Sequence, residues 1–246
     1  MNITRLRMTF VTCCAALLLG IGSAWAHIPL TPTILNDTLV AIEQAQKMVQ
    51  TATEPADKAS ALYAVATNAN ELMAMLNQEV QLHGFEQRDL LDAAAARALQ
   101  LGAEITWSED HERYFYTGDA YRQYLTLVPE GVEAAVSRYH LIETGFYTGN
   151  SESREDMAAR AATERDFLQR YPAFGDAGRV AMFLAIDYRD LWRICHATGD
   201  RECADAYAEL NREHLNAVSA RYAEERTGEL ARTLLERFEA ELANAQ

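Results

Sequence analysis

The sequence has 246 residues, and its 36 acidic residues outnumber its 22 lysines and arginines, which gives a formal net charge of −14 at pH 7. A chain this acidic repels phosphate groups, which argues against nucleic acids and anionic lipid surfaces as partners. The length suits one extended domain or two small ones.

Residues 1–26 have the pattern of a secretory signal peptide. Two early arginines precede an apolar run (residues 8–21), and residues 24–26 form the cleavage signal Ala-Trp-Ala. We therefore expect this segment to be removed and the mature protein to reside in the periplasm. The alternative is an uncleaved membrane anchor, although the apolar run is shorter than the ~20 residues of a spanning helix. Later apolar runs are shorter still, so the mature chain is not expected to span a membrane.

Cleavage after Ala26 would make His27 the new N-terminus. Its amine and imidazole could then chelate copper together if a second histidine lies close in space. The alternative is that a histidine follows the cleavage site by chance. Copper handling, or catalysis that uses His27, is therefore the second functional hypothesis.

Apolar residues recur at helical spacing through most of the remaining chain, so we predict an all-α fold. The first predicted helix carries an apolar stripe over residues 34–49, and the second begins after Pro55 and ends near His83. The third runs over residues 87–101. We expect these helices to form an N-terminal helical region, residues 27–118.

Residues 103–117 form a polar and aromatic link. A faint strand pattern is present at residues 104–107. The acidic run at residues 109–112 is typical of a solvated helix start, and a divalent-cation site is the lesser alternative.

From residue 119 onward the helical pattern is regular, and glycine, proline or Gly-Asp pairs separate most of the segments. Helices are predicted at about 119–128, 131–146, 153–170, 175–197, 201–221 and 226–243. Short connections force consecutive helices to lie antiparallel. A chain of such helix hairpins is an α-solenoid, which we predict for residues 119–246.

A pattern in residues 124–141 returns 43 residues later. In both copies a proline (Pro129, Pro172) lies just beyond a helix end, where its missing N–H costs little. An alanine (Ala134, Ala177) follows five residues later, in the next helix. A weaker third copy is present in the segment RYAEERTGELARTLLERF. The recurrence predicts the stacking of one repeated helix–turn–helix unit.

This pattern resembles tetratricopeptide repeats (TPR). It is most similar to the variant in exported bacterial proteins of the outer-membrane-assembly lipoprotein and periplasmic cell-division-coordinator type, where an F-x-x-x-Y-P helix end recurs. Here that helix end is residues 167–172, and the resemblance covers roughly residues 119–240. It implies a TPR-like scaffold that binds a protein or peptide partner in cell-envelope or outer-membrane assembly. The chain departs from the family in its longer period, against about 34 residues, and in its lack of a lipid-attachment cysteine.

Aromatic residues crowd the segment between positions 107 and 124. Tyrosine combines broad apolar contact with a hydroxyl group, a chemistry favoured in recognition surfaces. One interpretation is a partner-binding groove, and the alternative is that the rings pack the junction between the N-terminal helices and the repeats. The predicted groove comprises Tyr114, Tyr116, Tyr121, Arg122, Tyr124, Arg138 and Arg179.

Signal cleavage would leave two cysteines, Cys195 and Cys203, on either side of a Gly-Asp turn. In an oxidising compartment we expect them to form a disulfide that joins two helices near their turn. A metal pair is the lesser alternative, because no further close cysteine pair supports it.

Motifs of common enzyme classes are missing: the sequence has no GxxxxGK[ST], HExxH, GxSxG or GxGxxG. We therefore predict a protein that is not an enzyme, with no catalytic residues, no cofactor and no metal apart from the copper alternative. The charged residues Asp187, Arg189, Asp190 and Arg193 are expected to form surface pairs along one helix.

Overall fold

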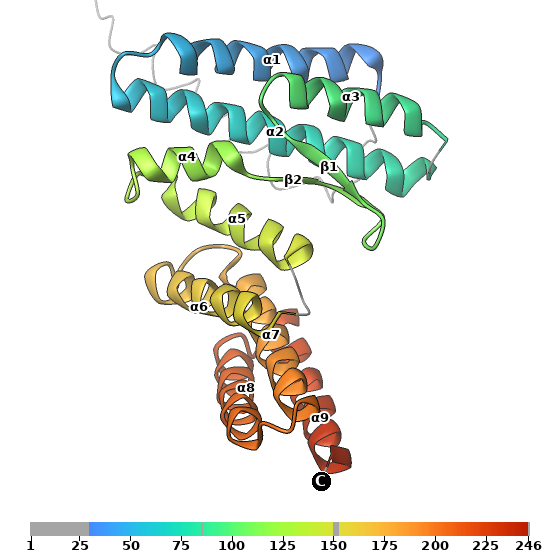
Figure 1. The fold of residues 1–246 in the computed structure, drawn as a ribbon, viewed down its shortest axis with the longest axis vertical. Coiled ribbons are helices and arrows are strands. Elements are labelled where there is room, and N and C mark those ends of the chain that lie inside the picture. The colour runs from blue at the N-terminus through green and yellow to red at the C-terminus, as the bar shows by residue number, and fades with distance from the viewer. Residues whose placement is uncertain (1–29, 85, 150–152, 246) are drawn as a thin grey trace, which may run out of the picture. The chain divides into compact units, whose positions relative to one another are not determined.

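The computed structural model describes residues 30–84, 86–149 and 153–245. Two units are distinguished, residues 1–31 and 32–246, and the second contains all the elements labelled in Figure 1. The predicted signal peptide and His27 lie outside the described residues. Within the described residues, no helix is both long and apolar enough to cross a membrane.

Three helices open the second unit: α1 (Pro32–Thr51), α2 (Pro55–His83) and α3 (Arg88–Gln100). Each of the first two begins at a proline, which is tolerated there because the first helical N–H has no intrahelical partner. Gly84, with a φ of 61°, follows the end of α2. Helix α1 packs along α2, and α3 contacts both. The three helices therefore have nearly the predicted bounds.

A small antiparallel hairpin follows where the sequence predicted a polar link. Its strands are β1 (Ile105–Ser108) and β2 (Arg113–Tyr116), and Ile105 pairs with Tyr116. β-Branched and aromatic side chains favour the strand conformation. Residues 109–112 form the turn, where Glu112 has a φ of 47°, so they are not the predicted start of a helix. Strand β2 packs against α2.

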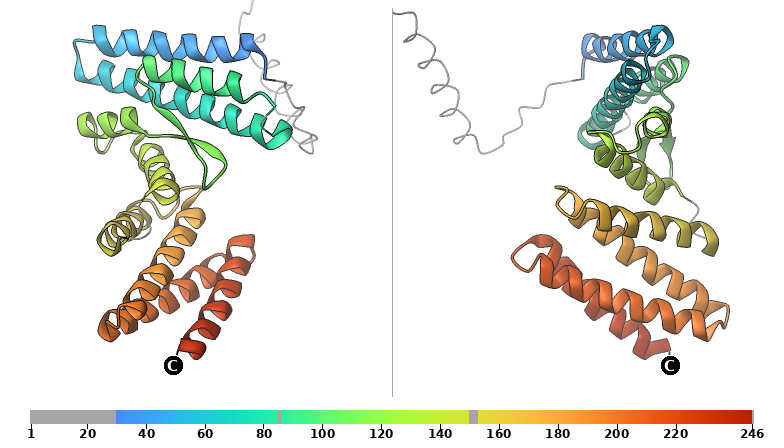
Figure 2. Two further views of the ribbon diagram at one scale, coloured as in Figure 1. Left: turned by 45° about the vertical axis from the view of Figure 1, so that its right-hand side comes forward. Right: turned by 90° about the vertical axis from the view of Figure 1, so that its left-hand side faces the viewer.

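Six helices complete the unit, each within three residues of its predicted bounds. They are α4 (Asp119–Leu127), α5 (Ala134–Thr148), α6 (Arg154–Arg170), α7 (Ala177–Ala197), α8 (Arg201–Arg221) and α9 (Arg226–Ala245). Each of them packs against the next along the chain, as the two views of Figure 2 show for the yellow-to-red segments. Helix α4 also packs against α2. Residues 32–118, from the first predicted region, thus meet those of the second within one unit.

The turns inside the pairs α4–α5, α6–α7 and α8–α9 share one hydrogen-bond pattern. In the second turn, the N–H of Phe174 donates to the carbonyl of Tyr171, and the N–H of Ala177 donates to the carbonyl of Phe174, both at 3.0 Å. The same two bonds recur at 2.9–3.0 Å among Val128, Gly131 and Ala134, and among Tyr222, Glu225 and Gly228. The recurring sequence pattern therefore corresponds to a recurring turn.

Buried side chains at helical spacing fill the seams between these helices. Tyr139, Phe167 and Phe183 belong to one cluster that joins α5, α6 and α7. Trp192 and Phe238 join α7 to α9 in another, with their ring centroids 5.2 Å apart. The described part of the chain is thus predominantly helical, with one two-stranded hairpin.

Candidate partner-binding cleft

The four tyrosines predicted to line a groove lie in the core instead. Their exposed fractions are 1%, 2%, 1% and 4% for Tyr114, Tyr116, Tyr121 and Tyr124. The Tyr114 hydroxyl donates to Asp92 at 2.6 Å, and the Tyr116 hydroxyl accepts from the Ala120 N–H at 3.1 Å. Burial raises the pKa of Tyr116 to about 12. The groove prediction is therefore wrong for these residues, because their rings pack the junction between the N-terminal helices and α4.

The three arginines of the predicted groove reach the surface but bind acceptors of the protein itself. Arg122 forms an ion pair with Asp119 at 2.6 Å, and Arg179 forms one with Glu143 at 2.5 Å. Arg138 donates to a backbone carbonyl at 3.1 Å. None of the three lines the cleft described next, which combines different residues.

A cleft of about 610 Å³, here called the hairpin cleft, is lined by residues of the hairpin, the C-terminal end of α5, and helices α6 and α7. Its volume falls in the range of sites that hold small molecules or peptide side chains. The hairpin, of which only a faint strand pattern at residues 104–107 was predicted, supplies one wall. The cleft is therefore built from segments that are far apart in the sequence.

Aromatic rings line much of the hairpin cleft. They belong to Trp107, Phe115, Phe146 and Tyr147. The guanidinium of Arg113 lies 5.1 Å from the centre of the Phe115 ring, and that of Arg160 lies 5.5 Å from the centre of the Phe146 ring. At these distances the negative face of a ring attracts a cation. Each of the four rings thus already faces a guanidinium of the protein itself, and the walls of the cleft suit apolar groups.

A buried ion pair also borders the hairpin cleft. Arg160 of α6 donates to both carboxylate oxygens of Asp187 of α7, at 2.7 Å and 2.5 Å. The Asp187 side chain is fully buried, and burial raises its pKa while the Arg160 guanidinium opposes that shift. Because Arg160 neutralises Asp187, the carboxylates left in the lining are those of Asp110 and of Asp190, which also pairs with Arg193 at 3.3 Å.

Glu164, one turn beyond Arg160 on α6, is fully buried, and neither of its carboxyl oxygens has a hydrogen-bond partner among the residues that the structure describes. Burial raises its pKa to about 9; nearby Asp187 adds to the shift, and Arg160 opposes it. The Glu164 carboxyl is therefore protonated at neutral pH. Helical spacing contained a signal of its burial, because Glu164 lies three residues after the buried Ala161 and three before the buried Phe167.

The hairpin is fastened to α5 at two points. His111 Nε2 donates to the carbonyl of Tyr147 at 2.7 Å, and its ring lies edge-on to that of Tyr147 at 5.6 Å. Thr144 donates its hydroxyl to the carbonyl of Tyr116 at 3.1 Å. These contacts fix the hairpin as a wall of the cleft.

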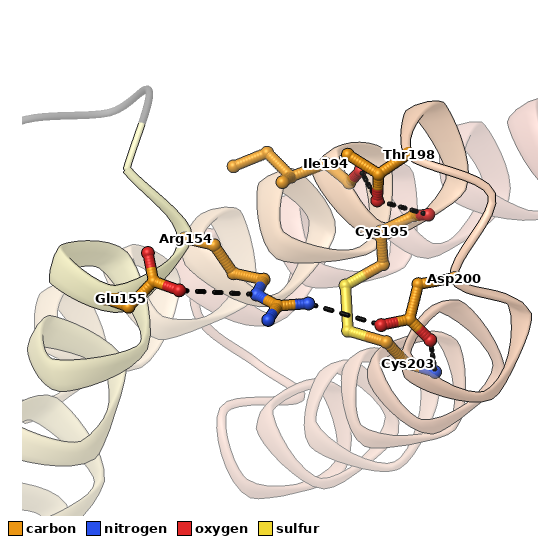
Figure 3. Close-up of a disulfide and its surroundings, with 7 residues drawn as sticks. All are labelled: Arg154, Glu155, Ile194, Cys195, Thr198, Asp200 and Cys203. Carbon is orange, nitrogen blue, oxygen red and sulfur yellow. Dashed lines mark hydrogen bonds and ion pairs between the residues drawn. A yellow bond between two sulfur atoms is a disulfide. The ribbon is translucent and has the colours of Figure 1, made fainter.

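The predicted disulfide between Cys195 of α7 and Cys203 of α8 is confirmed (Figure 3). The two Cα atoms are 5.6 Å apart. Asp200 accepts from the Cys203 N–H at 3.1 Å, which caps α8, and pairs with Arg154 of α6 at 3.2 Å. The disulfide and this capping aspartate together hold the α7–α8 turn.

The expected surface pairs along α7 are correct only in part. Asp190 and Arg193 do pair along the helix, at 3.3 Å. Asp187 instead faces α6, and Arg189 pairs with Glu241 of α9 at 2.5 Å. Helical spacing contained a signal for Asp187, because it lies one turn beyond the buried residue Phe183 and one turn before the buried residue Leu191.

His27 lies outside the described residues, so copper binding there stays a prediction. Among the described residues, no three histidine, cysteine, aspartate or glutamate side chains are grouped so that they could hold a metal ion. The acidic hairpin turn, residues 109–112, therefore contains no such group.

Comparisons with protein-family models and with curated proteins found no match. One similar solved structure, titled "DHF119 filament", has 19% sequence identity and a TM-score of 0.27, with 87% of this chain and 94% of that chain covered. A TM-score this low supports no conclusion about fold or function. The fold and the hairpin cleft define a predominantly helical, disulfide-containing protein with an aromatic and acidic surface site.

Proposed function

We propose that this protein is a periplasmic, non-enzymatic scaffold that binds a protein or peptide partner in the hairpin cleft. The observation that supports this most is the combination of four aromatic side chains with two carboxylates, Asp110 and Asp190, in one open cleft. A basic side chain flanked by apolar ones fits this lining, because apolar groups pack against aromatic rings and cations are attracted to carboxylates. The partner segment is therefore basic and apolar.

We further infer that residues 119–246 form a TPR-like α-solenoid of antiparallel helix hairpins. Three helix pairs with the same turn hydrogen bonds, each packed on the next, support this inference. Solenoids of this kind present extended surfaces on which partners dock. The cell envelope and outer-membrane assembly are the setting that the family resemblance implies, and a disulfide suits the oxidising periplasm.

Site-specific photo-crosslinking from the cleft tests the proposal in cells. A photo-reactive amino acid replaces Thr106, an exposed residue of the cleft, and in a matched control it replaces Thr163, an exposed residue of α6 outside the cleft. We expect a discrete crosslinked partner from position 106 only, and a much weaker adduct when Asp110→Asn and Asp190→Asn are added. Equal adducts from both positions would count against the cleft.

A further inference from the structure

A second cavity, of about 230 Å³, is lined by residues of α6, α7 and α8 and is here called the α6–α8 pocket. It shares no lining residue with the hairpin cleft. Its floor contains the buried side chains of Ala181, Leu184 and Val218. Tyr222 adds a partly buried ring. The interior of the pocket therefore suits an apolar group.

Both charged residues that line this pocket are arginines, Arg165 and Arg221. Within the described part of the chain, neither of them forms an ion pair, in contrast to Arg160, Arg170 and Arg179. The Arg221 guanidinium donates to a backbone carbonyl, and Arg165 interacts with a tyrosine hydroxyl. A guanidinium has five N–H donors, so both side chains retain donors for a ligand.

The remaining polar residues of the pocket do not offset this positive charge. His214 Nε2 donates to the Ala181 carbonyl at 2.8 Å, and burial lowers the pKa of His214, so its ring is neutral at pH 7. Gln169 is uncharged. The lining thus has a formal charge of +2 in a chain whose net charge is −14. A local charge opposite to that of the whole molecule favours an anionic ligand.

We propose that the α6–α8 pocket binds small apolar carboxylates: molecules in which one ring or a short branched chain carries a carboxylate. The apolar part occupies the floor, and the carboxylate pairs with Arg165 and Arg221 at the rim, since arginine binds carboxylates through charge-assisted hydrogen bonds. The volume of about 230 Å³ is smaller than that of a site for a drug-sized molecule, which limits the size of the acid. This proposal does not depend on partner binding in the hairpin cleft.

Isothermal titration of the mature chain with phenylacetate, at low ionic strength, tests the proposal. Phenylacetamide has nearly the same shape but no charge, and phenethylamine carries the opposite charge. We expect saturable binding of phenylacetate, at least about tenfold weaker binding of the amide, and no binding of the amine. Equal affinity for the acid and the amide would overturn the proposal, as would binding of a peptide that ends in phenylalanine without any binding of phenylacetate.

Three variants locate the site. Arg165→Gln and Arg221→Gln should each weaken phenylacetate binding about tenfold, and Ala217→Trp should block the pocket while keeping both arginines. Arg232→Gln removes an exposed arginine of α9 that does not line the pocket, and it should leave the affinity unchanged. Circular dichroism verifies that each variant is folded. Unchanged affinity in the folded Ala217→Trp variant would place the ligand elsewhere and overturn the proposal.

Discussion

Glu164 is the residue whose ionisation most directly opposes folding. Burial raises its pKa to about 9 in the folded chain, against an ordinary value of 4.5. Between these two values the unfolded chain releases the proton and the folded chain keeps it. The free energy of unfolding therefore falls as the pH rises from about 4.5 to about 9.

Glu164→Gln removes this titration while keeping the shape of the protonated side chain. We expect the free energy of unfolding of the variant to exceed that of the wild type by at least ~1 kcal/mol at pH 8 and by far less at pH 5. Urea denaturation at the two pH values measures the difference. A gain that is the same at both values would show that Glu164 is already ionised in the folded chain.

The Arg160–Asp187 pair gives a second prediction at this scale. Arg160→Ala would leave the buried carboxylate of Asp187 without its partner, and we expect a loss of about 3–5 kcal/mol. Replacing both residues, with Arg160→Met and Asp187→Leu, should recover most of that loss, because no buried charge remains. If urea denaturation shows that Arg160→Ala lowers the free energy of unfolding by less than ~1 kcal/mol, this prediction is wrong.

Among the elements, the third repeated turn leaves no room for a side chain at Gly228. A Cβ atom added at Gly228 would lie 2.1 Å from the carbonyl oxygen of Tyr222, whereas one added at Gly175, in the second turn, meets no atom within 4 Å. We expect Gly228→Ala to destabilise the protein by about 1–3 kcal/mol because backbone must move. Gly175→Ala is the matched control, and its stability should stay close to that of the wild type. Equal melting temperatures of the two variants would show that the turn can accommodate a Cβ atom at Gly228.

The α7–α8 disulfide closes a short loop, since its two cysteines are eight positions apart. Loop-closure entropy predicts that reduction lowers the free energy of unfolding by about 2–3 kcal/mol. Thermal unfolding with and without a reductant measures this loss. The variant with both Cys195→Ala and Cys203→Ala is the control, and its melting temperature should not respond to the reductant.

Helix bounds were predictable because prolines and glycines interrupt the chain where helices end. Of the hairpin, only the faint strand pattern at residues 104–107 was visible, which overlaps β1. The rest was not predictable, since each strand has only four residues and β2, with the sequence RYFY, has no alternating pattern. The aromatic content of the tyrosine cluster was visible, but sequence spacing does not tell a buried ring from one that lines a groove. The hairpin cleft itself depends on contacts between distant residues such as Arg160 and Asp187, which only the folded chain reveals.

For the whole molecule, we propose partner binding in the hairpin cleft, which is lined by the hairpin and by helices α5, α6 and α7. Its acidic lining matches the acidity of the entire chain, so electrostatic attraction would speed the approach of a basic partner and would weaken as salt is added. Replacing Asp110 and Asp190 by asparagine removes the negative charge that causes this attraction and leaves the size of both side chains almost unchanged.

The most direct test is the affinity of the purified crosslinked partner for the mature chain and for the variant with Asp110→Asn and Asp190→Asn. A charge-matched control carries Asp205→Asn and Glu236→Gln, two exposed positions on α8 and α9. We expect the cleft variant to bind at least about tenfold more weakly while the control binds like the wild type. Equal affinities for all three proteins would contradict this expectation.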